Sequence, residues 1–308
     1  MGLPVSIREA KLNALSCDRV SGQASPMNDN STTLWRGMNR VQLDAAYDNN
    51  AVVPDATQRR DGWIARSAEM RKNNPELLDL AYGPRERNRI DAFRCGKANA
   101  PLFCFIHGGY WQRNSKDIFS CMMAGPMAKG FDTAMIGYTL CPDVTLTELV
   151  AEIHAAIRYL RKEGPRRGFG GGKLIVSGWS AGGHLTASAL PLDEVDGGLA
   201  ISGIYDVEPC RLNYLNEKLK LTAAEAAAMS PILHLEKRKV PVTVAFGTSE
   251  LPELQRQSRD YHQARVSAGL PSTLLPLEPC NHFSIMDEME KPEGRLTGAL
   301  NSLIVGLG

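Results

Sequence analysis

The sequence predicts an α/β fold in which helices flank a mostly parallel central sheet, and three observations support this. Short apolar segments alternate with segments of helical periodicity along most of the 308 residues, which indicates repeated strand–helix units. Several of the short segments are apolar throughout, as is typical of strands buried on both faces. The composition, with 43% hydrophobic and 22% charged residues, is that of a globular protein.

The N-terminal part of the chain divides into two regions. Residues 1–30 end in a run rich in Ser, Asn and Asp and show no sustained periodicity, so we expect a mobile extension there. From about residue 35 to 75 the spacing is helical, and Pro54 interrupts it. The apolar anchors of this helical region are Trp35, Leu43, Tyr47, Trp63 and Ile64.

The first strands of the predicted sheet follow this helical region. Leu77–Tyr82 and Asn88–Phe93 indicate a hairpin, and Leu102–Ile106 and Thr133–Tyr138 are apolar runs that predict buried strands. The next segment is predicted to be a helix, because its apolar residues recur at helical spacing at Leu146, Leu149, Val150, Ile153, Ile157 and Leu160.

The second half continues the alternation, with one interruption. The expected strands and helices are, in order, Lys173–Ser177, Ala181–Leu190, Leu199–Ile204, Val240–Phe246, Glu253–Ala268, Ser272–Leu277 and a final helix over about Glu293–Val305. Residues 207–238 instead suggest two short helical segments, the second opened by a capping box of Thr222 and Glu225. We interpret 207–238 as a small helical insertion, or cap, over the C-terminal edge of the sheet, where such folds bind ligands.

The strongest chemical signal is the segment Gly178-Trp179-Ser180-Ala181-Gly182, a G-x-S-x-G pattern. An apolar strand runs into it and a helix of small residues runs out of it, which is the context of a nucleophile elbow. Bulky residues two positions either side of the serine would clash in so sharp a turn. We therefore predict Ser180 as the nucleophile, in a strained backbone conformation at a helix N-terminus.

A serine hydroxyl needs a base, and in this architecture the chain order is Ser, acid, His. His282 directly follows the last predicted strand, so we predict it as the base. Glu250 lies in the loop after the preceding strand and is preferred as the acid that orients it. Glu253 remains the alternative, although its position suits the first turn of a helix. Because the strands that carry these residues must share one sheet, residues 31–308 are predicted to form one domain.

An oxyanion hole needs backbone N–H groups aimed at the developing charge. We predict one from Ala181, directly after the nucleophile, and others from Gly108 and Gly109 after strand Leu102–Ile106. The preceding His107 is predicted to brace this glycine loop through hydrogen bonds.

With HGGYW, GWSAGG and a late Asn-His-Phe in place, the sequence resembles the α/β-hydrolases, and within them the kynurenine formamidase (arylformamidase) group, whose hallmark is H-G-G-x-W. The resemblance runs from about residue 40 to the C-terminus and includes LDAAYDNNAVVPD, YGP at 82–84, SGIYDVEP at 202–209 and ELPELQRQS at 250–258. It implies the α/β-hydrolase fold and the triad Ser180, Glu250 and His282. Members of the group often carry Asp where this chain has Glu250.

The resemblance implies hydrolysis of N-formylkynurenine to kynurenine and formate in tryptophan breakdown. The alternative is a carboxylesterase, or an aryl-amide or carbamate hydrolase, because ester and amide cleavage share this machinery. Candidates to line the substrate pocket are Tyr110, Trp111, Tyr205 and Tyr214, each of which could instead pack in the core. Trp179 is expected to pack beside the sheet rather than to face the substrate.

Composition narrows the partners and the compartment. A net charge of +1 is not that of a nucleic-acid-binding protein, no apolar run approaches the length of a membrane span, and the opening residues lack the apolar core of a secretory signal. The seven cysteines are scattered without a CxxC pair, so we expect a reducing cytoplasm. The sequence holds no HExxH motif and no dense His/Asp cluster. We therefore expect a small-molecule substrate, no cofactor and no metal, and a homodimer is possible for this fold.

Overall fold

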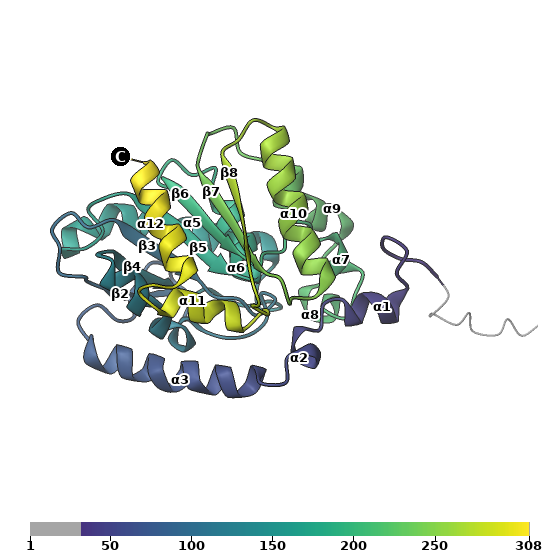
Figure 1. Ribbon diagram of the computed structural model, residues 1–308, viewed down its shortest axis with the longest axis horizontal. Coiled ribbons are helices and arrows are strands. Elements are labelled where there is room, and N and C mark those ends of the chain that lie inside the picture. The colour runs from purple at the N-terminus through teal and green to yellow at the C-terminus, as the bar shows by residue number, and fades with distance from the viewer. Residues whose placement is uncertain (1–31, 308) are drawn as a thin grey trace, which may run out of the picture.

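The computed structural model describes residues 32–307, so the extension predicted over residues 1–30 lies outside the described residues. An eight-stranded sheet runs through the molecule in the order β1-β2-β4-β3-β5-β6-β7-β8 (Figure 1). Its strands are β1 (Leu80–Ala81), β2 (Arg89–Phe93), β3 (Leu102–Ile106), β4 (Asp132–Ile136), β5 (Leu174–Trp179), β6 (Gly197–Ile201), β7 (Val242–Gly247) and β8 (Ser272–Leu277).

The sheet is mostly parallel, as predicted. β4, β3, β5, β6, β7 and β8 pair in parallel, and β1 and β2 form an antiparallel pair that continues antiparallel onto β4. β3 and β8 have the predicted bounds, and the other predicted strands are shifted or shortened by a few residues. The antiparallel β1 and β2 confirm the predicted hairpin, although β1 has only 2 residues.

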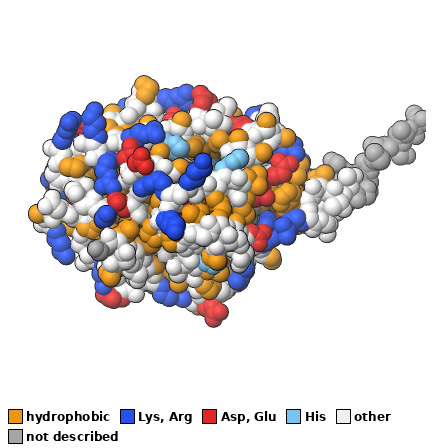
Figure 2. Space-filling view, turned by 90° about the horizontal axis from the view of Figure 1, so that it is seen from above, with side chains coloured by type: hydrophobic (Ala, Val, Ile, Leu, Met, Phe, Trp, Pro, Cys, Tyr) orange, Lys and Arg blue, Asp and Glu red, His pale blue; other side chains and the backbone are white. Residues whose placement is uncertain are grey.

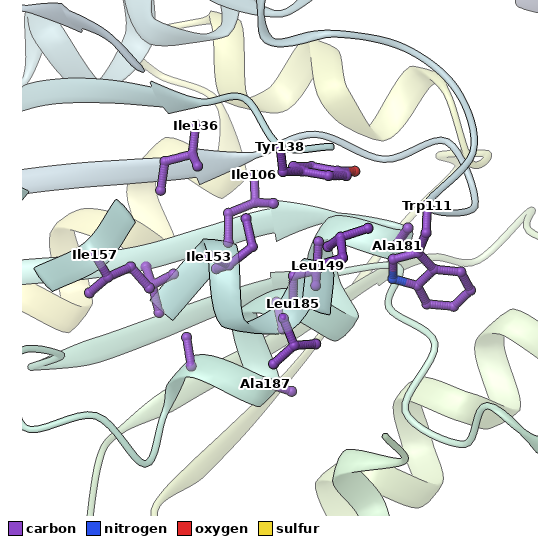
Figure 3. Packing of buried hydrophobic residues seen from close by; sticks show 14 of the residues in the cluster. Ile106, Trp111, Ile136, Tyr138, Leu149, Ile153, Ile157, Ala181, Leu185 and Ala187 are labelled. Carbon is purple, nitrogen blue, oxygen red and sulfur yellow. The ribbon is translucent and has the colours of Figure 1, made fainter. Parts of the chain in front are cut away.

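Helices cover both faces of the sheet, which explains why β3, β4, β5, β6 and β7 are buried along their whole length. The helices are α1 (Arg40–Ala45), α2 (Asn49–Val52), α3 (Ala56–Asn73), α4 (Ala124–Ala128), α5 (Leu146–Glu163), α6 (Ala181–Ala189), α7 (Glu208–Arg211), α8 (Asn216–Leu219), α9 (Ala223–Ala228), α10 (Pro252–Ser267), α11 (Asp287–Glu290) and α12 (Arg295–Gly306). One apolar cluster joins the sheet to α1, α5, α6 and α10, and a second joins it to α3 and α12. Figure 3 shows side chains of α5 and α6 gathered with those of β3 and β4 in the first cluster.

The predicted helical region before the sheet is confirmed, with the break at Pro54 between α2 and α3. α3 crosses the lower side of the molecule in Figure 1 and forms two ion pairs with α11. Arg59 lies 2.6 Å from Asp287, and Arg66 lies 2.6 Å from Glu290. These pairs join the segment before the sheet to the segment that follows His282.

The predicted insertion is present but differs in detail. Residues 207–238 contain three short helices, α7, α8 and α9, rather than two. Thr222 caps α9 as predicted, because its hydroxyl accepts a hydrogen bond from the Glu225 N–H. The second half of the capping box is absent, because the Glu225 carboxylate instead accepts from the N–H and the hydroxyl of Thr147. The Glu225 side chain therefore fixes α9 to the start of α5.

The structure also shows the surface charge, the character of the helices and the state of the cysteines. On the face shown in Figure 2, basic and acidic side chains are interspersed rather than segregated, as a net charge of +1 suggests. Among the described residues, no helix combines the length and the apolar character that crossing a bilayer requires. The six described cysteines are all free thiols, and Cys17 lies outside the described residues.

A buried ammonium group holds together the edge of the sheet that β1 and β2 form. The side chain of Lys116, only 6% exposed, lies 2.7 Å from Asp79, 2.8 Å from Asp91 and 2.7 Å from Asp117. Burial alone would lower the pKa of Lys116, but the hydrogen bonds to the three carboxylates outweigh it and raise this pKa. The three carboxylates are close enough to hold a metal ion, yet the ammonium already satisfies them.

Replacing Lys116 by Met should destabilise the protein by about 3 kcal/mol, because the change leaves the buried Asp91 with one cationic partner fewer. The measurement is the free energy of unfolding from urea titration. Lys129→Met is the matched control, since Lys129 pairs with the 88% exposed Glu293, and its cost should stay below about 1 kcal/mol. Equal effects of the two substitutions would contradict a structural role for the Lys116 ammonium.

Candidate active site

The G-x-S-x-G segment forms the predicted strand–turn–helix. β5 ends at Trp179, α6 begins at Ala181, and Ser180 between them has φ +59° and ψ −118°, a sparsely populated conformation for a residue with a side chain. The steric reason for the glycines also holds. A Cβ on Gly178 would lie 2.3 Å from the Gly182 carbonyl oxygen, and one on Gly182 would lie 2.0 Å from the Ile106 carbonyl oxygen.

The structure brings Glu250 and His282 together at the same edge of the sheet. His282 Nδ1 lies 3.3 Å from Glu250 Oε2, and both side chains are almost completely buried. The other oxygen of the carboxylate accepts hydrogen bonds from the Ser202 hydroxyl at 2.5 Å and the Gly247 N–H at 2.7 Å. Three donors therefore hold the carboxylate in one orientation, as a group that orients a base requires.

Glu253, the alternative acid, has a different environment. It lies in the first turn of α10 and pairs with Arg256 of the same helix at 2.8 Å. Tyr47 also contacts it, through a hydroxyl 3.4 Å away. The structure thus places Glu250, and not Glu253, against His282.

Ser180 and His282 line one cavity, called the Ser180 cavity below, of about 80 Å³. Among the described residues no hydrogen bond joins the two side chains, and in an enzyme without substrate such contacts are often long. Trp179 links the elbow to His282, because its indole N–H donates to the His282 carbonyl oxygen at 2.8 Å and the two rings lie 4.8 Å apart. The elbow therefore positions the histidine as well as the serine.

The glycine loop lies against the elbow. A Cβ on Gly108 would lie 2.6 Å from the Trp179 carbonyl oxygen and 3.0 Å from Ser180 Cβ, and Gly109 has φ +123°. Within residues 32–307, the N–H groups of Gly108, Gly109 and Ala181 donate to no other group. These three donors, the predicted oxyanion hole, are therefore free for a ligand oxygen.

Two buried histidines brace this region. His107 stacks on Tyr138 with ring centroids 4.2 Å apart, and its Nδ1 bonds the Gly108 carbonyl oxygen at 2.9 Å. His184 accepts from the Trp111 indole N–H at 3.2 Å and contacts the Met229 carbonyl oxygen at 2.7 Å through Nε2. His107 thus supports the glycine loop as predicted, and His184 ties that loop to α6 and to the insertion.

The Ser180 cavity is mostly aromatic, with polar groups on one side. Trp63 is the centre of the aromatic wall, 5.6 Å from Phe119, 5.8 Å from Trp179 and 6.2 Å from Phe283 between ring centroids. Besides Ser180, His282 and these four rings, the cavity is lined by Asn49, Asn50, Arg60, Gly109, Tyr110, Arg113 and Asn114. No acidic side chain of the described residues lines it.

Three of the four predicted pocket aromatics lie elsewhere, and only Tyr110 lines the cavity. Trp111 is fully buried against His184, and Tyr205 is fully buried and stacked on Tyr261 with ring centroids 4.1 Å apart. Tyr214 packs over α1, where its N–H donates to Asp44 at 2.8 Å. These three side chains are used to pack the helices beside the site. Trp179, which was expected to pack away from the substrate, is part of the cavity wall.

One part of the cavity wall was not predicted from the sequence. It is formed by α2 and α3, through Asn49, Asn50, Arg60 and Trp63, and not by the insertion, which contributes no lining residue among those described. No motif marks α2 or α3, because their role depends on how they fold back over the sheet. The one signal was the resemblance of LDAAYDNNAVVPD to the formamidase group, which covers the start of this wall.

Comparisons with known proteins agree with this geometry. A profile of the BD-FAE family matches residues 92–196. Kynurenine formamidase from Danio rerio is 28% identical over 88% of this chain and 98% of its own, and that from Salmo salar is 27% identical over 86% and 97%. A crystal structure of a proposed thioesterase from Silicibacter sp. tm1040 is 28% identical, covers 84% of this chain and 99% of its own, and superposes with a TM-score of 0.76.

An esterase from Pyrobaculum calidifontis superposes with a TM-score of 0.65 over 87% of this chain and 99% of its own, at 16% identity. At this identity the match shows the fold alone. Together the matches show the α/β-hydrolase fold, and those at 27–28% identity support a hydrolase that acts on a small amide or ester.

The buried histidines make stability depend on pH. Burial lowers the pKa of His107 to about 3 and of His184 to about 4, whereas the unfolded chain binds these protons below about pH 6.5. The free energy of unfolding should therefore fall as the pH drops from about 6.5 to about 4, by up to about 1.4 kcal/mol per pH unit for each histidine.

The measurement is the urea midpoint between pH 7 and pH 4.5, for the wild type and for His184→Gln. A glutamine can donate to the Met229 carbonyl and accept from the Trp111 indole without titrating. The unfolding free energy of the variant should therefore depend less steeply on pH, by the contribution of one histidine. An unchanged slope would contradict the assignment of His184 as a buried neutral group.

Proposed function

We propose that this chain, an α/β-hydrolase of the kynurenine formamidase-like group, is a serine hydrolase that cleaves a small acyl amide, N-formylkynurenine or a similar aryl amide. The observation that carries the proposal is the Glu250–His282 contact beside the strained Ser180 at one small cavity. The relatives named kynurenine formamidase support the substrate class.

In this proposal the Ser180 hydroxyl attacks the acyl carbon while His282 takes its proton. Glu250 keeps the imidazole in the orientation that presents Nε2 to the serine and stabilises the imidazolium that forms. His282 then gives the proton to the leaving nitrogen. A water molecule, activated by the same histidine, releases the acyl group from Ser180.

The negative charge of the tetrahedral intermediate needs donors that are already in place. The free N–H groups of Gly108, Gly109 and Ala181 lie on the two segments that meet at Ser180. These N–H groups need not move when the carbonyl oxygen becomes an oxyanion, because the close approach of Gly108 to the elbow fixes their positions.

The cavity suits a small acyl group. Sites that enclose a drug-sized ligand have roughly 300–1,000 Å³, whereas the Ser180 cavity has about 80 Å³. Only the reacting end of a substrate fits inside it, so the leaving group must extend toward the mouth. A formyl group meets this limit with no further acyl pocket.

The mouth favours a leaving group that carries a carboxylate. Arg60 and Arg113 line the cavity and are exposed, and among the described residues neither has a carboxylate partner. N-formylkynurenine carries a carboxylate on the part of the molecule that would extend toward the mouth. We infer that these arginines attract that carboxylate.

The second candidate function is that of a carboxylesterase, or of a hydrolase of another aryl amide or a carbamate. The 28% identical structure described as that of a thioesterase supports it, and the same serine, histidine and oxyanion donors would serve it. Comparing substrates on purified protein separates the two candidates.

We expect kcat/KM for N-formylkynurenine to exceed that for p-nitrophenyl acetate, measured by absorbance on the same preparation. Ser180→Ala should lower kcat by about 10⁶-fold for both substrates, because the nucleophile is removed, and a chelator should leave the activity unchanged. Good turnover of the ester with an inert N-formylkynurenine would contradict the formamidase proposal. Activity retained in Ser180→Ala would contradict the serine mechanism itself.

Arg113→Gln combined with Arg60→Gln should raise KM for N-formylkynurenine about 10-fold and leave KM for the neutral p-nitrophenyl acetate within about 2-fold, because only the former presents a charge to the mouth. The effect on the charged substrate should weaken as salt is added. Arg158→Gln is the matched control, since Arg158 is exposed on α5. Equal changes for both substrates would show that the arginines do not select charge.

A further inference from the structure

Asn49 presents a hydrogen-bond acceptor that nothing in the described protein uses. The residue is 4% exposed and lies at the start of α2, on the wall of the Ser180 cavity. Its Nδ2 donates to the Tyr110 hydroxyl at 2.8 Å, whereas its Oδ1 is buried without a partner among residues 32–307. An unpaired buried carbonyl of this kind is destabilising, so it calls for an explanation.

The orientation of the Asn49 amide follows from its neighbours. The Tyr110 hydroxyl has one proton, which it donates to the Tyr47 carbonyl oxygen. The same hydroxyl must therefore accept from Asn49, and only the amide nitrogen can donate to it. The carbonyl oxygen of Asn49 cannot take that place, and it stays free.

Tyr110 connects this amide to the predicted oxyanion loop. It follows Gly109 directly, has φ +52° and lines the same cavity as Asn49, Ser180 and His282. A residue with a side chain adopts this conformation only where its surroundings impose it. The hydrogen bonds from Tyr47 through Tyr110 to Asn49 thus hold Asn49, with its unpaired acceptor, in the wall of the Ser180 cavity.

We propose that Asn49 Oδ1 accepts a hydrogen bond from the N–H of the scissile amide and thereby selects amides over esters of the same shape. A secondary amide keeps this N–H throughout the reaction, because its lone pair, and not its N–H, takes the proton from His282. An ester has an oxygen without a hydrogen at that position, so it would leave the acceptor unpaired. Sites built to bind a substrate N–H discriminate strongly against analogues that lack it.

The inference rests on the proposed function, and it deepens it, because the triad and the oxyanion donors do not distinguish the two bond types. It assigns the preference to Asn49 and makes Tyr110 a positioning residue. It also explains why a wall that the sequence motifs do not mark carries a buried polar side chain among aromatic rings.

The experiment compares formanilide and phenyl formate, which differ only in N–H against O at the scissile bond, on the full-length protein with the spontaneous rate subtracted. We expect Asn49→Ala to lower kcat/KM for formanilide about 10- to 100-fold and to change that for phenyl formate less than 3-fold. Tyr110→Phe should lower the same amide-to-ester ratio by a smaller factor, because the Asn49 amide loses the group that orients it.

Asn50→Ala is the matched control, since Asn50 is an exposed asparagine beside Asn49 on the same cavity, and it should keep the ratio within 3-fold of the wild type. Equal losses for both substrates in Asn49→Ala would overturn the inference, whether they come from misfolding or from a general role. If the wild type cleaves phenyl formate and leaves formanilide intact, the proposed function as an amide hydrolase is contradicted. If the wild type cleaves both and the ratio survives Asn49→Ala, only the role of Asn49 fails.

Discussion

The close approach of the serine turn to the end of β3 is the contact on which the rest of the site depends. A Cβ on Gly182, at the start of α6, would clash with the Ile106 carbonyl, and one on Gly108 would clash with Trp179 and Ser180. Since β3 and β5 are parallel neighbours, their carboxyl ends reach the same edge of the sheet. A single methyl group at either glycine would separate the serine from the N–H groups that face it.

The same edge collects the groups that follow β7 and β8, where Glu250 and His282 are buried and in contact. Contacts from Ser202, Gly247 and His282 hold the Glu250 carboxylate in one orientation. Trp179 connects the elbow to His282 through one hydrogen bond and a ring contact. Trp63 then closes the aromatic wall from α3, which the ion pairs with α11 hold in place. Strained backbone at Ser180 and Tyr110 persists because these neighbours surround it.

Features with a local cause were predictable from the sequence. The segments Leu102–Ile106 and Ser272–Leu277 became strands with the expected bounds. The first is buried along its whole length, and burial on both faces leaves a continuous apolar signature. The pattern around Ser180 was equally informative, since a sharp strand-to-helix turn restricts the residues two positions away. Thr222 capped its helix as expected, yet Glu225 turned to Thr147, 78 positions away in the sequence. A local rule cannot foresee such a competing partner.

By itself, the sequence determined the alternation of strands and helices, the elbow, and the order of serine, acid and histidine, because periodicity and turn chemistry act within a few residues. Tertiary structure decided which carboxylate meets His282 and which aromatics face the cavity. Glu250 and Glu253 are only three positions apart in the sequence. Glu250 precedes α10, which begins at Pro252, whereas Glu253 lies in the first turn of that helix. Trp111 and Tyr205 pack inward while Trp63 and Trp179 form the wall, because an aromatic ring settles wherever packing between distant elements buries it best.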